Sequence, residues 1–165
     1  MTGYPPAPMR SAPARPLLAL LAALALAVVL PACGDDVEKS NAYVDAVNKA
    51  QNDFAVTFDR LNRSITSTST PAQDRQTLGR FQEAVATVTE ELNAVAPPEA
   101  VATLHTKLIR EIGGYGVEVG KAREAFASTD PQKVIAAQTD LVTSVTSVAT
   151  RINTTIDQIN KKLRE

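Results

Sequence analysis

The sequence has little of what most catalytic and metal-binding sites require. It contains one cysteine, one histidine, two methionines and no tryptophan in 165 residues. A lone cysteine cannot form an intrachain disulfide, and one histidine cannot supply the two Glu-x-x-His motifs of a di-iron helical bundle. The haem-attachment motif Cys-x-x-Cys-His and the catalytic-serine turn Gly-x-Ser-x-Gly are absent. No methionine occurs after Met9, so the rest of the chain has none that could serve as an axial haem ligand. The sequence therefore predicts no cofactor, no metal site and no enzymatic activity.

An excess of charge of one sign is also missing. The 17 basic residues nearly balance the 18 acidic residues, which gives a net charge of −1. Proteins that bind nucleic acid usually carry a basic patch or stripe. The sequence has none, so a nucleic-acid partner is not expected.

The longest apolar run lies near the N-terminus. Residues 17–30 consist only of leucine, alanine and valine, and Arg10 and Arg15 are the only charges before them. This run is shorter than the ~18 residues of a spanning helix and has the length of a signal-peptide core. Either Met1 or Met9 fits as the start of such a leader. Residues 1–32 are therefore predicted to be a signal peptide that is removed.

The single cysteine follows the leader directly. The segment Leu30-Pro31-Ala32-Cys33 resembles the lipobox of bacterial lipoproteins, with proline where that motif most often has alanine or serine. In that family a peptidase cleaves before the cysteine, which then carries acyl chains, and two or more chains hold a protein stably at a membrane. The resemblance implies that lipidated Cys33 anchors the protein to the extracytoplasmic face of the cell membrane. A conventional export signal with a free cysteine and an uncleaved anchor are the alternatives.

The chain after the leader has the size of one domain. Residues 33–165 carry 15 basic and 18 acidic side chains, a net charge of −3. Residues 33–39 are predicted to be a tether and residues 40–165 a helical domain. In architecture this domain resembles the small helical lipoproteins of bacteria that have no assigned activity.

Apolar residues recur at steps of three and four along four segments, which is typical of one face of an α-helix. The helices are predicted over residues 40–66, 71–95, 98–127 and 131–163, with Asp130 as the N-cap of the last. The expected apolar faces are Tyr43, Val47, Ala50, Phe54, Phe58, Leu61 and Ile65; Leu78, Phe81, Val85, Val88, Leu92 and Val95; Val101, Leu104, Leu108, Ile112, Tyr115, Val119, Ala122 and Phe126; and Val134, Gln138, Leu141, Val145, Val148, Ile152, Ile156, Ile159 and Leu163. Because the links are short, the predicted fold is all-α, an antiparallel up-down-up-down four-helix bundle.

Three side chains on these helices are candidates for contact with a ligand or a partner. His105 is expected either at the core boundary with one nitrogen in solvent, or as an imidazole that contacts a ligand or senses pH. Tyr115 lies in the glycine-rich residues 113–116, where missing side chains permit a kink, a close helix neighbour or a shallow groove. Gln138 is polar on an apolar face and is expected to fix the helix register or to lie beside that groove.

The expected function follows from the anchor and from the lack of a catalytic set. The sequence predicts a non-enzymatic, lipid-anchored module that binds protein or has a structural role in the cell envelope. Its partners would be the membrane, through Cys33, and another envelope protein. The alternative is small-molecule or lipid binding in an inter-helix groove near residues 113–116.

Overall fold

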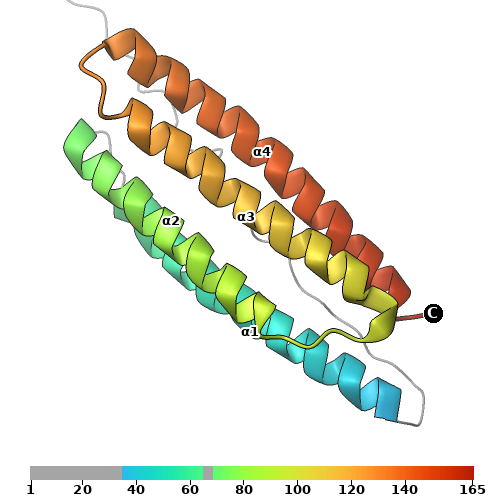
Figure 1. Ribbon diagram of the computed structural model, residues 1–165. Helices are drawn as coiled ribbons and strands as arrows, with labels where there is room; N and C mark the ends of the chain where they lie inside the picture. The colour runs from blue at the N-terminus through green and yellow to red at the C-terminus, as the bar shows by residue number, and fades with distance from the viewer. Residues whose placement is uncertain (1–34, 65–68) are drawn as a thin grey trace, which may run out of the picture.

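The computed structural model describes residues 35–64 and 69–165, and this part of the chain is all-α. It contains no strand. The elements are α1 (Asp35–Ser64), α2 (Pro71–Asn93), the short 3₁₀ helix η1 (Glu99–Val101), α3 (Ala102–Ala125) and α4 (Pro131–Lys162), as Figure 1 shows. The four segments predicted to be helical therefore all form helices.

The bounds differ from the predicted ones most at two N-terminal ends, and the ends of α2, α3 and α4 lie one or two residues earlier than predicted. Helix α1 begins at Asp35, so the prediction of a tether is wrong for residues 35–39. No proline or glycine interrupts α1, and Glu38 places a carboxylate in its first turn, where the helix dipole favours negative charge. Helix α3 begins at Ala102 because the tighter turn of η1 takes up the residues before it.

Side-chain caps fix the starts of α2 and α4. Thr70 and Gln73 form a reciprocal capping box, in which Gln73 N donates to Thr70 Oγ1 at 3.3 Å and Thr70 N donates to Gln73 Oε1 at 2.8 Å. Asp130 Oδ1 accepts from Gln132 N at 2.9 Å, which confirms the predicted N-cap. Each cap satisfies a main-chain donor that has no partner within the helix and contributes about 1 kcal/mol.

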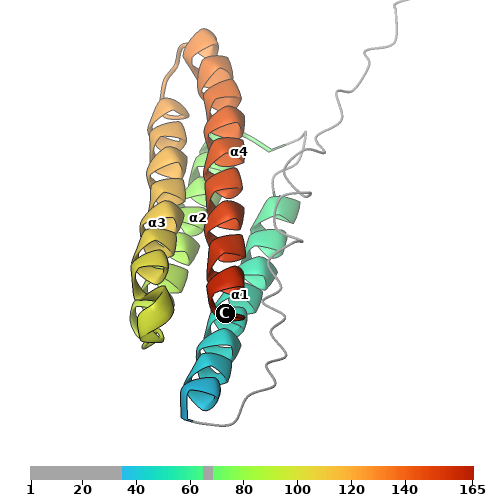
Figure 2. The same cartoon turned by 90° about the vertical axis from the view of Figure 1, so that its right-hand side faces the viewer.

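Each helix packs against the helix before it in the chain. The pairs are α1 with α2, α2 with α3, and α3 with α4. In the described part of the chain, the backbone of α1 makes close contact with α2 and with no other helix. Figure 2 shows that α1 diverges from α4 along its length, so that the C-terminal end of α1 lies away from α4. The side of the molecule between α1 and α4 is therefore its least closed side.

The core is divided into two apolar clusters. The first cluster draws on all four helices and consists of Tyr43, Val44, Val47, Ala50, Val88, Leu92, Val101, Leu108, Ile156, Ile159 and Leu163. The second cluster consists of Phe58, Leu61, Leu78, Phe81, Ala84, Val119 and Ala122, and it reaches α4 only through the half-buried Leu141. The second cluster is therefore built from three helices, with α4 at its edge.

The first half of α4 is correspondingly poorly covered. Residues 131–144 contain no buried residue, and Ile135 and Val142 are 56% and 38% exposed. Gln138 is exposed as well, so the prediction that it fixes the helix register in the core is wrong. The physical reason is that α1 makes no close backbone contact with α4. The apolar periodicity of α4 corresponds to full burial only from Val145 onward.

This difference in packing predicts different costs for the same substitution. Leu108→Ala removes a fully buried side chain from the first cluster and should lower the free energy of unfolding by about 2–5 kcal/mol. Leu141→Ala removes a half-buried leucine and should cost roughly 1 kcal/mol, because less apolar surface returns to water. Urea unfolding of both variants measures the difference. Equal losses in the free energy of unfolding would show that the first half of α4 is packed as closely as the first cluster.

Candidate functional site

His105 forms a buried polar link between three helices. Its side chain is 4% exposed and lies among the apolar residues of the first cluster. Nε2 lies 3.0 Å from the main-chain carbonyl oxygen of Leu92, and Nδ1 lies 3.2 Å from the Tyr43 hydroxyl. Since a carbonyl only accepts, Nε2 carries the proton, and Nδ1 accepts from the Tyr43 hydroxyl. The imidazole of α3 thus joins the last turn of α2 to the first half of α1.

Burial favours the neutral form of both side chains in this link. It lowers the pKa of His105 below its ordinary value of 6.5, and the hydrogen bond to the Leu92 carbonyl acts in the opposite direction. It raises the pKa of Tyr43 to about 12. The two rings meet edge to face, with centroids 5.5 Å apart and an interplanar angle of 73°. The neutral pair satisfies both ring nitrogens without a buried charge.

The expectation of a boundary histidine with one nitrogen in solvent is therefore wrong. Main-chain carbonyls in the last turn of a helix lack a donor within that helix. The Leu92 carbonyl is one of these, and it accepts from both Val95 N and His105 Nε2. The end of α2 thus supplies a buried acceptor that helix periodicity alone does not reveal.

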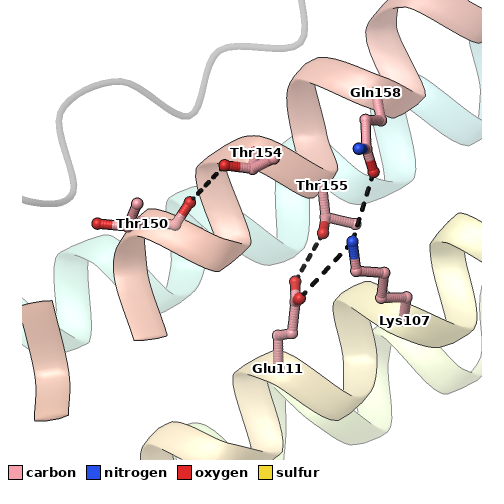
Figure 3. Close-up of polar contacts among 6 residues, drawn as sticks. All are labelled: Lys107, Glu111, Thr150, Thr154, Thr155 and Gln158. Atoms are coloured by element: carbon pink, nitrogen blue, oxygen red, sulfur yellow. Dashed lines mark hydrogen bonds and ion pairs between the residues drawn. The ribbon is translucent and has the colours of Figure 1, made fainter. Parts of the chain in front are cut away.

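A second buried polar contact joins α3 to α4 (Figure 3). Thr155 is fully buried, and its hydroxyl donates to Glu111 Oε2 at 2.7 Å. The Glu111 side chain is 11% exposed, and Lys107 Nζ lies 4.0 Å from its second carboxylate oxygen. Lys107 also donates to Gln158 Oε1 at 3.4 Å, so it approaches α4 beside the carboxylate. This contact fixes α4 on α3 in the half of the helices that carries the first cluster.

The hydroxyl of Thr155 is used differently from its neighbours on α4. The exposed threonines of this helix donate to the carbonyl four residues earlier; they are Thr139, Thr143, Thr146, Thr150 and Thr154. Thr155 donates across the helix interface instead. A hydrogen bond to a charged group is stronger than one between neutral groups, so this contact contributes more than a local one.

Two glycines of α3 allow close approach of α2. A Cβ at Gly116 would lie 3.1 Å from Val85 Cγ1, and a Cβ at Gly120 would lie 2.6 Å from Gln82 Nε2. Helix α3 continues through both positions. Of the outcomes expected for residues 113–116, close packing is therefore observed at Gly116, and Gly120 packs closely in the same way.

The glycines at 113 and 114 differ from Gly116 in what surrounds them. A Cβ at Gly113 or Gly114 would meet nothing within 4 Å, so both positions border open space. Tyr115 is half-buried and packs against Phe58 of the second cluster, with ring centroids 6.4 Å apart. Burial raises the pKa of its hydroxyl above the ordinary value, and this hydroxyl has no hydrogen bond among the described residues. Tyr115 is a packing residue here.

A groove of about 610 Å³ lies between the second half of α3 and the first half of α4. Small and apolar residues line much of it: Ala122, Ala125, Ala136, Ala137 and Leu141. Glu118, Lys121, Lys133 and Asp140 supply charged groups along it. Lys121 donates to Glu118 Oε1 at 2.9 Å, and this hydrogen bond lowers the pKa of the Glu118 carboxyl. The groove has a volume typical of ligand sites. Its two acidic and two basic side chains balance one another in charge.

The residues singled out from the sequence are not brought together in one site. Cys33 lies outside the described residues, so its lipidation stays a prediction. His105 belongs to the first cluster, Tyr115 packs on the second, and Gln138 is exposed on α4. Sequence reasoning missed the Glu111–Thr155 contact, since a threonine on a threonine-rich helix gives no sign of its partner. Tyr43 was expected only as a core residue.

The described residues contain no group of three or more His, Cys, Asp or Glu side chains placed to hold a metal ion. None of the helices in the ranges 35–64 and 69–165 is long and apolar enough to span a membrane. The chain matches no protein-family model, no curated protein and no solved structure.

The contact between Glu111 and Thr155 predicts a large difference between adjacent threonines. Thr155→Val keeps the side-chain shape but leaves the largely buried carboxylate without its donor, so the free energy of unfolding should fall by about 1–3 kcal/mol. Thr154→Val, with an exposed side chain, should change it by less than about 0.5 kcal/mol. Thermal or urea unfolding distinguishes them. A Thr155 variant as stable as the Thr154 variant would show that the contact is unimportant.

Proposed function

We propose that this protein is a lipid-anchored module of the bacterial cell envelope that binds another protein through the exposed half of α4. The anchor is Cys33 of the lipobox-like segment, at the extracytoplasmic face of the membrane. The role is non-enzymatic and uses no cofactor. The observation that supports binding is the exposure of Ile135 and Val142 on residues 131–144, the half of α4 that has no buried residue.

We further propose that the four helices form an antiparallel, up-down-up-down bundle. The first cluster combines the first half of α1 with the second half of α2, the first half of α3 and the second half of α4. Such alternation is expected when neighbouring helices run in opposite directions. The start of α1, which follows Cys33, then lies at the end that holds the first cluster. The exposed half of α4 lies toward the opposite end, away from the membrane.

The exposed apolar side chains of α4 suit recognition by a partner. Ile135 and Val142 are seven residues, or about two helical turns, apart and therefore project from similar faces of α4. Full burial of such a side chain contributes roughly 1.5–3 kcal/mol. The other large exposed apolar residues of the described part, Val56 and Val117, occur singly on α1 and α3. Single exposed residues of this kind are normal on a protein surface, so they serve as controls.

A second candidate function is binding of a small amphiphilic molecule or a lipid in the groove between α3 and α4. The groove has about 610 Å³, a size typical of ligand sites, and alanines line it beside Lys121 and Lys133. It lies at residues 118–144 rather than at residues 113–116. This candidate uses the same half of α4, but its ligand would contact Ala137 rather than Ile135.

The anchor predicts the behaviour of Cys33→Ala in cells that make the protein. Without the thiol no acyl chain can be attached, so the variant should leave the membrane fraction or accumulate with its leader uncleaved. Fractionation followed by gel mobility measures both effects. A variant that fractionates and migrates like the unaltered protein would contradict lipid anchoring.

The binding face is tested by a photo-activated cross-linking residue placed at Ile135 or Val142 in the full, membrane-bound chain. The proposal predicts one discrete adduct from these positions, and no such adduct from the control position Val117, which is 57% exposed on α3. Adducts that are the same at all three positions, or absent from α4, would contradict it.

The second candidate gives a different result in the same protein. Native mass spectrometry should then show a bound mass that disappears in Ala137→Leu, where the larger side chain enters the groove. The α4 adduct would be absent in that case.

A further inference from the structure

The groove between α3 and α4 has two charged side chains that lack a partner within the described part of the chain. Of its four charged side chains, Glu118 and Lys121 form a salt bridge with each other at 2.9 Å. Lys133 and Asp140 of α4 form no ion pair and no hydrogen bond with a described residue. Both are exposed. The groove therefore presents one unpaired cation and one unpaired anion beside the alanines that line it.

The spacing of these two charges keeps them from pairing with each other. Lys133 and Asp140 are seven residues apart, so they lie on the same face of α4, about 10.5 Å from each other along its axis. Ion pairs within a helix join residues that are three or four positions apart. Ala136 and Ala137 lie midway between the two charges. Reversing the direction of the segment therefore exchanges the two charges about the same midpoint.

A second copy of α4 that runs in the opposite direction would match this pattern. With a twofold axis between Ala136 and Ala137, Lys133 of each copy would lie opposite Asp140 of the other. The result is two equivalent ion pairs, because a twofold interface brings the same patch of both subunits together. Alanines at the centre allow two helices to approach to about 8 Å, the short end of the usual range. A parallel copy would instead place like charges opposite each other.

We propose that the groove between α3 and α4 is a self-association surface, in which α4 of a second copy packs antiparallel to α4 with Lys133 opposite Asp140. The groove of about 610 Å³ receives the side chains of the second helix. Ile135 and Val142 each follow one of these charges by two residues, or about 200° of helix rotation. They project from the other side of α4, so the pair leaves them free for the partner of the proposed function.

The direction of the pair determines where it forms in the anchored protein. The first half of α1 and the second half of α4 share the first cluster. Because α4 runs in opposite directions in the two copies, the starts of their α1 helices lie at opposite ends of the pair. Copies anchored at Cys33 therefore pair from facing membranes rather than within one membrane. This consequence rests on the proposed function, whereas the pairing uses only residues of the described helices.

Charge reversal tests the pairing in the full chain solubilised in detergent, where no membrane fixes the orientation of a copy. Two copies with different affinity tags are produced together, and the amount of one that is retained through the other is measured. Asp140→Lys leaves only cations on this face and Lys133→Asp only anions, so each variant places like charges opposite each other twice. Since like charges at an interface repel, we expect each variant to retain itself about tenfold less than the unaltered chain does.

The two variants should nevertheless pair with each other. In a mixture of Asp140→Lys with Lys133→Asp, one copy contributes the cations and the other the anions, so both ion pairs are restored. We expect retention comparable to that of the unaltered chain. Asp157→Lys reverses an exposed charge of α4 outside the groove and is the matched control, which should self-associate like the unaltered chain.

Vesicles that carry the full chain test the consequence for anchored copies: they should cluster, and vesicles that carry Asp140→Lys should not. The proposal is overturned if the unaltered chain stays monomeric in detergent, if either single variant self-associates like the control, or if the two variants do not pair with each other. A monomer with a bound small mass would assign the groove to the second candidate function instead. Pairing in detergent without clustering of vesicles would contradict the proposed anchor or helix arrangement and leave the pairing in place.

Discussion

The buried imidazole of His105 is the interaction on which the organisation of the helices most depends. It is polar and almost inaccessible to water, so each nitrogen needs a partner. The partners come from α1 and α2, which fixes the relative positions of three helices at once. The contact of Thr155 with Glu111 adds α4 to the same half of the structure. Burial of apolar surface is non-directional, so it does not fix how the helices are positioned along one another. Together these polar links fix that position.

The two halves of the helices consequently differ in character. One half has the first cluster, with buried residues from every helix and two satisfied polar links. The other half has a cluster of three helices, a groove between α3 and α4, and an α4 segment with exposed isoleucine and valine. In the proposed arrangement the half with the first cluster lies next to the anchor at Cys33 and the open half lies away from it, which suits presentation of a binding face.

The helices themselves could be predicted from the sequence because apolar spacing of three and four reports directly on burial of one helix face. The role of Asp130 as the N-cap before Pro131 could be predicted equally well, since capping is a local effect. The role of His105 was not, because its acceptor is a carbonyl of another helix. The prediction for Gln138 was wrong for the opposite reason: its spacing matches a buried face, but α1 makes no close backbone contact with α4 and Gln138 is exposed. Periodicity gives the face of a helix, and tertiary packing decides whether that face is covered.

Packing is tight around His105 and open along the first half of α4. Residue-resolved amide hydrogen exchange along α4 at neutral pH tests it most directly, because both regimes occur within one helix. We expect residues 145–162 to exchange many times more slowly than residues 135–144, with the slowest amides beside Thr155 and Ile159. Equal protection along the whole of α4, or stronger protection in its first half, would contradict it.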